Sequence, residues 1–345
     1  MEKPGYNMQG PIFVVGTPRS GTTLCAEILG RHSTIYTGGE NHFFEDVYAR
    51  RDQLGPLEAG EEGVGRVVER LLSIYGRYNQ LDDQRLVDAM NTTGAVEAQL
   101  KAHCRSYAEC LNAFMDLQMQ RAGKRRWGNN TPKDIFHAGE ILELFPTAKF
   151  VVCVRDLRDF MLSYRNRWRV TTPEHRERLR ALYHPILTAL LWKATVQRAL
   201  SLRAAHGGGR VLLLRYEDLV AAPEKTVRRL CAFLGVVFEP SMLQVGGHNS
   251  SRHGERGGIF TDSVGRWAKE LPPEEAWLGE RVVGSRLIEL GYVRMAEQVS
   301  WLRAAARAAS FSAAALRALW SNRAVRGPLL PYLGKRMRGL VGGVR

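Results

Sequence analysis

The stretch PIFVVGTPRSGTTL, residues 11 to 24, decides the fold class of this chain. Its apolar run at 11 to 16 is rich in branched residues and ends in glycine, which predicts a buried parallel strand, and a helix is expected to start near Leu24. In between, Gly16 and Gly21 let the backbone turn tightly enough for successive N–H groups to point inward, and the following helix adds its positive N-terminal end. The segment Gly16 to Thr23 is therefore predicted to cradle an anionic group.

This loop has the spacing of the phosphate-binding pattern G-x-x-x-x-G-K-[ST], with one departure. Thr22 stands at the lysine position, and Arg19 lies inside the loop. Enzymes that use ATP or GTP place that lysine on the β- and γ-phosphates and hold Mg²⁺ with a hydroxyl and a carboxylate. Because the lysine is missing and no apolar strand ends in a clear metal-binding Asp, the sequence favours a donor that needs no metal. A glycine-rich turn with solvated hydroxyls is the alternative.

The chain beyond the loop alternates between strand-like and helix-like segments. The apolar runs at 149–154 and 210–216 each follow a helix-forming stretch, and this alternation predicts an α/β fold with a central parallel sheet. Residues 50–125 have a helix-forming composition and are expected to form a helical insert over the sheet. The predicted organisation is an N-terminal arm at 1–10, one catalytic domain at 11–300 and a C-terminal tail at 301–345.

Charge and cysteine content narrow the function classes. The formal net charge is +14 over 345 residues, and residues 301–345 contain nine Lys or Arg and no Asp or Glu, so the remainder carries only 14 − 9 = +5. A nucleic-acid-binding protein fits the high charge, but no aromatic-basic binding motif appears. The five cysteines are odd in number and lack C-x-x-C spacing, which predicts neither disulfides nor a zinc site. With no signal peptide or membrane span in the sequence, we expect a cytoplasmic location.

Three further motifs follow in order. The first, FVVCVRDLRDFMLSYRNRW at 150–168, runs from a buried strand into Arg155 and then into a helix that carries Ser163. If that helix begins just after the strand, Arg155 and Ser163 face one site, and Arg167 falls one turn beyond Ser163 on the same helix face. The alternative is that Arg155 pairs with Asp156 or Asp159 at a solvated helix start. The other two motifs are RYEDLVAAPEKTVRRLCAFLGV at 215–236 and HNSSRHGERGGIFTDSVGRWAKEL at 248–271.

Together these motifs resemble the sulfotransferases that use 3′-phosphoadenosine-5′-phosphosulfate (PAPS), especially the bacterial and tyrosylprotein-sulfotransferase-like branch. The resemblance covers about residues 11 to 290 and implies a P-loop-type three-layer fold. It implies that the first loop grips the 5′-phosphosulfate, that the second motif clamps the 3′-phosphate, and that the last motif folds over the donor. The residues that this assigns to the donor are Arg19, Ser20, Gly21, Thr22, Thr23, Arg155, Ser163, Arg167, Tyr216, Ser251 to Phe260, and Arg266. Arg266 stands where the family often has lysine.

Sulfuryl transfer needs a base for the acceptor proton and groups that stabilise the departing nucleotide. Glu40 is the predicted base, because it follows two glycines after the cradle and the tyrosylprotein branch carries its base in a similar context. His42 is the competing candidate, and either side chain could instead cap a helix or be solvated. For the leaving group, the resemblance points to Lys133 in NNTPKD, with assistance from Ser251. An ordinary surface lysine is the alternative reading of Lys133.

The tail begins with an alanine-rich stretch at 301–320 that predicts a helix. Four polar residues are expected on one face and four apolar residues on the other, which makes a basic amphipathic helix. These residues are Arg303, Arg307, Ser310 and Arg317, against Trp301, Ala308, Leu316 and Leu319. Such a helix either lies on an anionic membrane surface, at the membrane inner face, or docks on its own core with the arginines outward. The sequence favours neither.

These observations predict a sulfotransferase that moves a sulfuryl group from PAPS to an acceptor hydroxyl by in-line displacement, with no metal. The acceptor class stays open between a small molecule, a carbohydrate, a lipid and a peptide tyrosine, and a homodimer is not excluded. A P-loop small-molecule or nucleoside kinase is the first alternative, and it should require Mg²⁺ and ATP. A non-catalytic nucleic-acid-binding protein is the second.

Overall fold

The computed structural model describes residues 10–55, 57, 61–79, 98, 100, 102–170, 176–177, 179–180, 182–246, 258–295 and 299–326. Its centre is a parallel sheet of five strands in the order β2-β3-β1-β4-β5. The strands are β1 (Ile12–Gly16), β2 (Ile35–Thr37), β3 (Arg126–Asn130), β4 (Lys149–Val154) and β5 (Val211–Arg215). The expected α/β fold with a parallel sheet is confirmed.

Three of the five strands were predicted, and β2 and β3 were missed. β3 has the sequence RWGNN and pairs with β1 along Ile12–Val14, with all five of its residues buried. Polar side chains within it find partners inside the protein: Arg126 donates from Nε to the Gly10 carbonyl at 2.8 Å. A run of arginine and asparagines carries no strand pattern, because its burial depends on partners that are distant in sequence.

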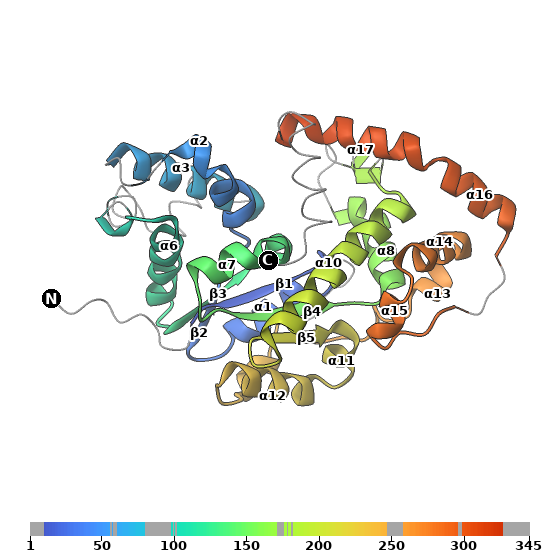
Figure 1. Cartoon of the computed structure of the whole chain (residues 1–345). Coiled ribbons are helices and arrows are strands. Elements are labelled where there is room, and N and C mark those ends of the chain that lie inside the picture. Colours follow the sequence, from blue (N-terminus) through green and yellow to red (C-terminus); the bar gives the residue numbers. More distant parts are fainter. Residues whose placement is uncertain are drawn as a thin grey trace.

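Two helical layers cover the sheet, since successive residues of β1 point to opposite faces. Ile12 and Val14 pack with α1 (Thr22–Gly30) and α12 (Pro223–Leu234), while Phe13 and Val15 pack in the other core with α10 (Pro185–His206). Figure 1 shows α11 and α12 on one side of the strands and α10 on the other. The expected three-layer arrangement is therefore confirmed.

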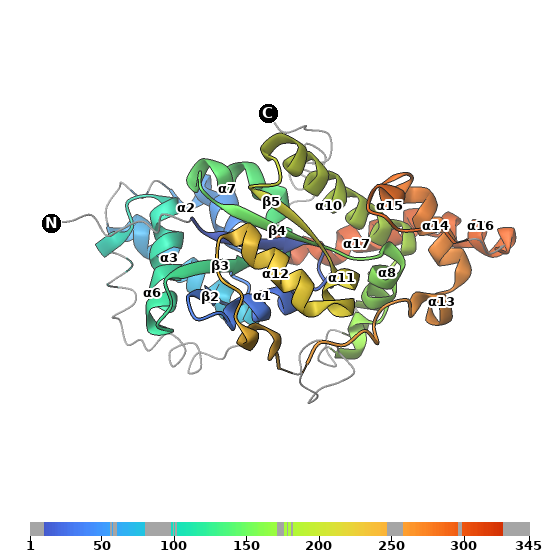
Figure 2. The ribbon, with the colours of Figure 1, turned by 90° about the horizontal axis from the view of Figure 1, so that it is seen from below.

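Between β2 and β3 the secondary structure of the described residues is helical, with short connecting loops. Its helices are α2 (Arg51–Leu54), α3 (Glu61–Asn79) and α6 (Tyr107–Arg121), preceded by the short π-helix η1 (Phe43–Val47) and the 3-10 helix η2 (Tyr48–Arg50). Both views place α3 and α6 at the end of the sheet that carries β2 and β3 (Figures 1 and 2). This agrees with a helical insert; the exact domain bounds stay a prediction.

The remaining described elements are helices that follow β3, β4 and β5 along the chain. They are η4 (Pro132–His137), α7 (Ala138–Leu144), α8 (Leu157–Arg165), η5 (Arg167–Val170), α11 (Tyr216–Ala221), η6 (Pro240–Leu243), α13 (Trp267–Glu270), α14 (Pro273–Val283), α15 (Arg286–Glu289), α16 (Trp301–Ala309) and α17 (Phe311–Arg326). None of the helices in the described ranges is long and apolar enough to span a membrane.

The tail forms two helices instead of one. It packs on the body of the protein, but not with all of its arginines pointing outward, as the docked alternative predicted. Arg307 of α16 faces the body of the protein and donates to Glu275 of α14 at 2.8 Å. Ser310, between the two helices, lies 3.2 Å from Nε2 of the buried His184. Docking with the arginines outward is therefore wrong for Arg307, because a buried carboxylate on the core draws this arginine inward.

Candidate active site

The carboxyl ends of all five strands meet at one edge of the sheet, and each is followed by a predicted site residue. β1 leads into the loop at 16–23, β4 into Arg155 and β5 into Tyr216, while Glu40 follows β2 and Lys133 follows β3. In open parallel sheets, this edge is where ligands bind. The five segments are far apart in sequence, and the parallel pairing brings them to the same edge.

The loop after β1 has the geometry that its glycines predict. Gly16 and Gly21 have φ values of +143° and +89°. A Cβ on Gly16 would clash with the Cys153 carbonyl, and one on Gly21 would lie 2.6 Å from Cδ2 of Tyr216. α1 begins at Thr22, two residues earlier than expected, and its first turn has no acidic residue and no side-chain cap. Its first N–H groups therefore remain available for an anion.

The other residues of the loop differ in exposure. Ser20 is buried and hydrogen bonds through its hydroxyl to that of Thr17. Thr22 is also buried, whereas Thr23 and Arg19 are exposed. Arg19 has a positive φ of 72°, which is unusual for a residue with a side chain. The guanidinium of Arg19 is thus presented at the surface of the loop.

Arg155 is held in place at the end of β4 from several directions. Its carbonyl accepts a hydrogen bond from Nε1 of Trp192 at 2.8 Å. Its guanidinium lies 4.5 Å over the Tyr216 ring and donates to the carbonyls of Arg19 at 3.3 Å and Ser263 at 2.6 Å. Among the described residues, nothing accepts a hydrogen bond from its buried Nε. The guanidinium of Arg155 is therefore held in place, and its Nε–H can still donate a hydrogen bond to a ligand.

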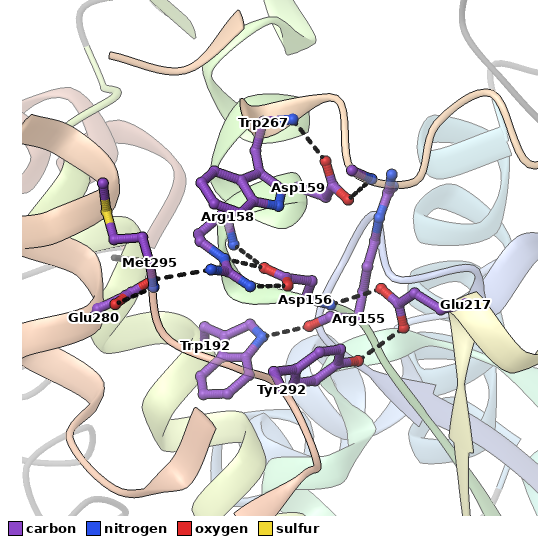
Figure 3. A network of polar contacts seen from close by, with 11 residues as sticks. Arg155, Asp156, Arg158, Asp159, Trp192, Glu217, Trp267, Glu280, Tyr292 and Met295 are labelled. Carbon is purple, nitrogen blue, oxygen red and sulfur yellow. Dashed lines mark hydrogen bonds and ion pairs between the residues drawn. The ribbon is translucent and has the colours of Figure 1, made fainter. Parts of the chain in front are cut away.

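The alternative that Arg155 pairs with a neighbouring aspartate is wrong. Asp156 instead forms an ion pair with Arg158 at 2.5 Å, and Arg158 also contacts Glu280 at 3.1 Å. Figure 3 shows this network beside Arg155. Because Arg158 takes the carboxylate of Asp156, the charge of Arg155 is left for another partner.

Asp159, the second aspartate in question, holds the loop that precedes α13. Its two carboxylate oxygens accept hydrogen bonds from the backbone N–H groups of Gly265 at 2.7 Å and Trp267 at 3.0 Å (Figure 3). Burial raises the pKa of Asp159 to about 6, although the charge of Arg155 and these two N–H groups act in the other direction. Ser263 of the same loop hydrogen bonds to Oη of Tyr216 at 2.6 Å. Asp159 therefore anchors a loop that reaches the predicted donor site.

Arg19 links Arg155 to Ser163 and Arg167. Arg19 Nε donates to Ser163 Oγ at 3.2 Å, so the phosphate loop and α8 are in contact. Arg167 does not share the face of α8, because that helix ends at Arg165 and Arg167 begins η5. Its guanidinium lies 4.3 Å over the ring of Tyr164, which belongs to α8. Although Arg19 is exposed as a residue, protein atoms around its guanidinium displace water, and this desolvation, followed by the charges of Arg155 and Arg167, lowers its pKa. Three guanidinium groups thus lie near one another.

A second cluster forms around Glu40. His42, which is buried, has its Nε2 2.7 Å from Glu40 Oε2 and its Nδ1 3.5 Å from Glu45 Oε2. Burial by itself lowers the pKa of His42, but hydrogen bonds to Glu40 and Glu45 raise it to about 9. At neutral pH His42 is therefore an imidazolium that donates to Glu40. A protonated imidazole cannot take a proton, so this geometry favours Glu40 over His42 as a base.

Lys133 belongs to this second cluster. Its Nζ lies 3.2 Å from Glu45 Oε2, in an ion pair that sequence reasoning did not anticipate. The next residue, Asp134, is buried and accepts a hydrogen bond from Nδ2 of Asn129 at 2.7 Å. Burial raises the pKa of Asp134 to about 7. Glu45 was missed, although its position three residues after His42 is the spacing of one helical turn.

Arg266 is a predicted site residue that is not brought to either cluster. Arg266 forms a two-point contact with Glu270, at 2.9 and 2.8 Å, instead of turning towards Arg155. Phe260 is half-buried and packs near Gly258, and Ser251 lies outside the described residues. In the parts of the chain that the structure describes, no group of three His, Cys, Asp or Glu side chains is placed to hold a metal.

Comparisons with known proteins identify relatives of this sequence. Residues 11–240 match the model of the sulfotransferase family. Protein-tyrosine sulfotransferase A of Caenorhabditis elegans is 26% identical over 303 residues, which cover 84% of this chain and 69% of that protein. Nodulation protein NoeE of Sinorhizobium fredii is 26% identical over 302 residues, which cover 81% and 65%. The chain thus spans about two thirds of the length of these relatives.

A solved structure shares the fold. The sulfotransferase domain from the curacin biosynthetic pathway has a TM-score of 0.53 and 22% identity, and the match covers 84% of this chain and all of that domain.

Proposed function

This chain belongs to the sulfotransferase family and is therefore a transferase, and we propose that it moves a sulfuryl group from PAPS to an acceptor hydroxyl. In this proposal the donor lies between the phosphate loop after β1 and the end of β4, and the acceptor approaches from the side of Glu40. The domain spans 11–300, with the insert at about 50–125 and the tail at 301–345.

One observation carries the proposal. Arg19, Arg155 and Arg167 lie near one another at the phosphate loop, and no described carboxylate lies within ion-pair distance of any of them. Asp159 feels the charge of Arg155 but is bonded to backbone N–H groups and makes no ion-pair contact with it. Like charges that gather without a carboxylate in ion-pair contact cost free energy, and an anionic ligand would remove that cost. A donor with separate 5′ and 3′ phosphate groups fits, because these cations come from two neighbouring strands.

The residues around the loop also fit the donor by size and chemistry. Gly21 packs so closely on Tyr216 that a side chain there would fill the space, and the uncapped N-terminus of α1 offers N–H donors. Arg155 Nε is buried without an acceptor among the described residues. We assign Arg19, Ser20, Gly21, Thr22 and Thr23 to the 5′ end. We assign Arg155, Ser163 and Arg167 to the 3′ phosphate, and Tyr216, Phe260 and Arg266 to further donor contacts.

In the proposed reaction the acceptor oxygen forms a bond to sulfur while the bond from sulfur to the 5′-phosphate oxygen breaks. The acceptor proton passes to the carboxylate of Glu40, which the protonated His42 orients. The N–H groups of the loop, and Lys133 and Ser251, stabilise the charge that develops on the departing nucleotide. Lys133 would first have to exchange its contact with Glu45 for one with the donor.

Calorimetry with adenosine 3′,5′-bisphosphate, in the presence of EDTA, tests the donor site. We expect binding that does not depend on Mg²⁺, followed by transfer from labelled PAPS to a panel of hydroxyl acceptors. Relatives named protein-tyrosine sulfotransferase are a reason to include a tyrosine peptide, beside carbohydrates, lipids and small molecules. Magnesium-dependent binding of ATP in place of the bisphosphate would favour the kinase alternative, which Thr22 argues against. A cytoplasmic location and a homodimer stay predictions.

A further inference from the structure

The C-terminal helices α16 and α17 lie along one edge of the molecule (Figure 1). α16 packs against α14, and α17 packs against α10. Their contact with the body is made through small and polar residues: Ala304 and Ala314 are buried, and Arg307 is bonded to Glu275. The side of the helices that faces the protein is therefore the side that holds Arg307.

The outer side of the same helices is apolar. Leu302 is 85% exposed, Leu316 68% and Trp320 63%. Exposed alanines lie between these three residues, at steps of three or four positions along the sequence. Because a helix turns by about 100° per residue, side chains at such steps lie on one face and form a stripe. We call this stripe the apolar ridge; its members are Leu302, Ala305, Ala309, Ala313, Leu316 and Trp320. Trp301, 69% exposed, borders it. Large apolar side chains gathered on one outer face indicate an interaction surface.

The charge around the apolar ridge indicates what covers it. Between residues 299 and 326 the sequence has five arginines and no Asp or Glu. Arg303 and Arg317 are exposed, so they are free to meet a partner beside the ridge. Two copies of the chain that met ridge to ridge would bring these like charges together, which disfavours self-association. An anionic surface satisfies both the charge and the apolar stripe.

We propose that the apolar ridge binds the surface of an anionic lipid membrane. The helices lie in the plane of the interface, Leu302 and Leu316 enter the apolar layer, and Arg303 and Arg317 contact the headgroups. Trp301 stays packed edge to face against Trp277 of α14, at 5.0 Å between ring centroids. This inference goes beyond the proposed function, since it concerns where the enzyme acts and does not depend on which acceptor it uses. Basic side chains that border an apolar helix face are the usual arrangement in interfacial helices.

The test is co-sedimentation of the full chain with two kinds of vesicle, phosphatidylcholine alone and phosphatidylcholine mixed with phosphatidylglycerol. Leu316→Glu places a carboxylate on the ridge. The matched control is Val237→Glu, which makes the same charge change at an exposed aliphatic residue (80% exposed) after α12, on the other face of the sheet. We expect Leu316→Glu to weaken binding to the anionic vesicles about tenfold or more, and Val237→Glu to bind like wild type.

A second variant separates the two contributions. Arg303→Gln is expected to weaken binding to anionic vesicles and to leave the weaker binding to neutral vesicles unchanged. Calorimetry with the bisphosphate on every variant shows whether the donor site is intact, so a failure of this inference is distinguishable from a failure of the proposed function. The inference is overturned if wild type ignores anionic vesicles, if Leu316→Glu and Val237→Glu bind equally, or if ultracentrifugation shows that Leu316→Glu dissociates a dimer.

Discussion

Replacement of Arg155 by alanine is the sharpest test of the donor site. Arg155 is 8% exposed, and its two Nη groups already donate to backbone carbonyls. The Nε–H is therefore the donor that Arg155 still has for a bound phosphate. One hydrogen bond from this charged guanidinium to a phosphate oxygen contributes about 1.5–3 kcal/mol. Since about 1.4 kcal/mol is a factor of ten, the Kd for adenosine 3′,5′-bisphosphate should rise about 10- to 150-fold.

Calorimetry measures this change, and two further variants show its cause. Arg155→Lys keeps the charge but loses the planar fork over Tyr216, so an intermediate Kd is expected. Arg228→Ala is the matched control, because Arg228 is exposed and paired with Glu224 on α12. Thermal unfolding of each variant shows whether the loop that Arg155 contacts through Ser263 is still in place. A folded Arg155→Ala protein that binds the bisphosphate like wild type would refute the clamp.

Three other predictions follow from the same geometry. Glu40→Gln should lower kcat in the transfer assay about 10²- to 10⁴-fold, because an amide cannot take the acceptor proton. The Kd of the bisphosphate, measured by calorimetry, should stay nearly unchanged. Unaltered turnover would show that Glu40 is not the base. Gly21→Ala should lower the free energy of unfolding by about 1–3 kcal/mol in denaturant titrations, since φ there is +89° and the new Cβ would press on Tyr216; an unchanged midpoint would contradict this. The pKa of Asp134 is raised to about 7 in the folded protein, against an ordinary 3.8. Between these two values the folded protein keeps a proton that the unfolded chain has released. The free energy of unfolding should therefore fall as pH rises from about 4 to about 7. Asp134→Asn should flatten this dependence, and equal slopes in both proteins would argue against it.

The donor side of the site was largely predictable, because local sequence determines it. Gly16 and Gly21 bracket a tight loop between an apolar strand and a helix, and Arg155 comes directly after an apolar strand. Each of these signals lies within a few residues of the group that it positions. The meeting of Arg19 with Ser163 was also predictable, since it follows from a parallel pairing of β1 with β4.

The polar contacts that orient the site were not predictable in the same way. Nothing near Lys133 in sequence indicates Glu45, which lies 88 residues away, and the strand before Lys133 lacks an apolar pattern. Arg167 was assigned to a helix that ends two residues earlier. The direction of Arg307 depended on Glu275, and helical periodicity alone cannot say which face of a helix meets the core.

The order of the strands has a consequence for how such an enzyme diverges. β2, which leads to Glu40, is a three-residue strand at the edge of the described sheet, next to β3, whereas β1 and β4, which lead to the donor groups, lie in the middle. Substitutions near an edge disturb fewer neighbours than substitutions in the centre. New acceptor preferences can therefore arise through changes around β2 and the helices that follow it, while the apparatus that recognises the nucleotide is inherited intact.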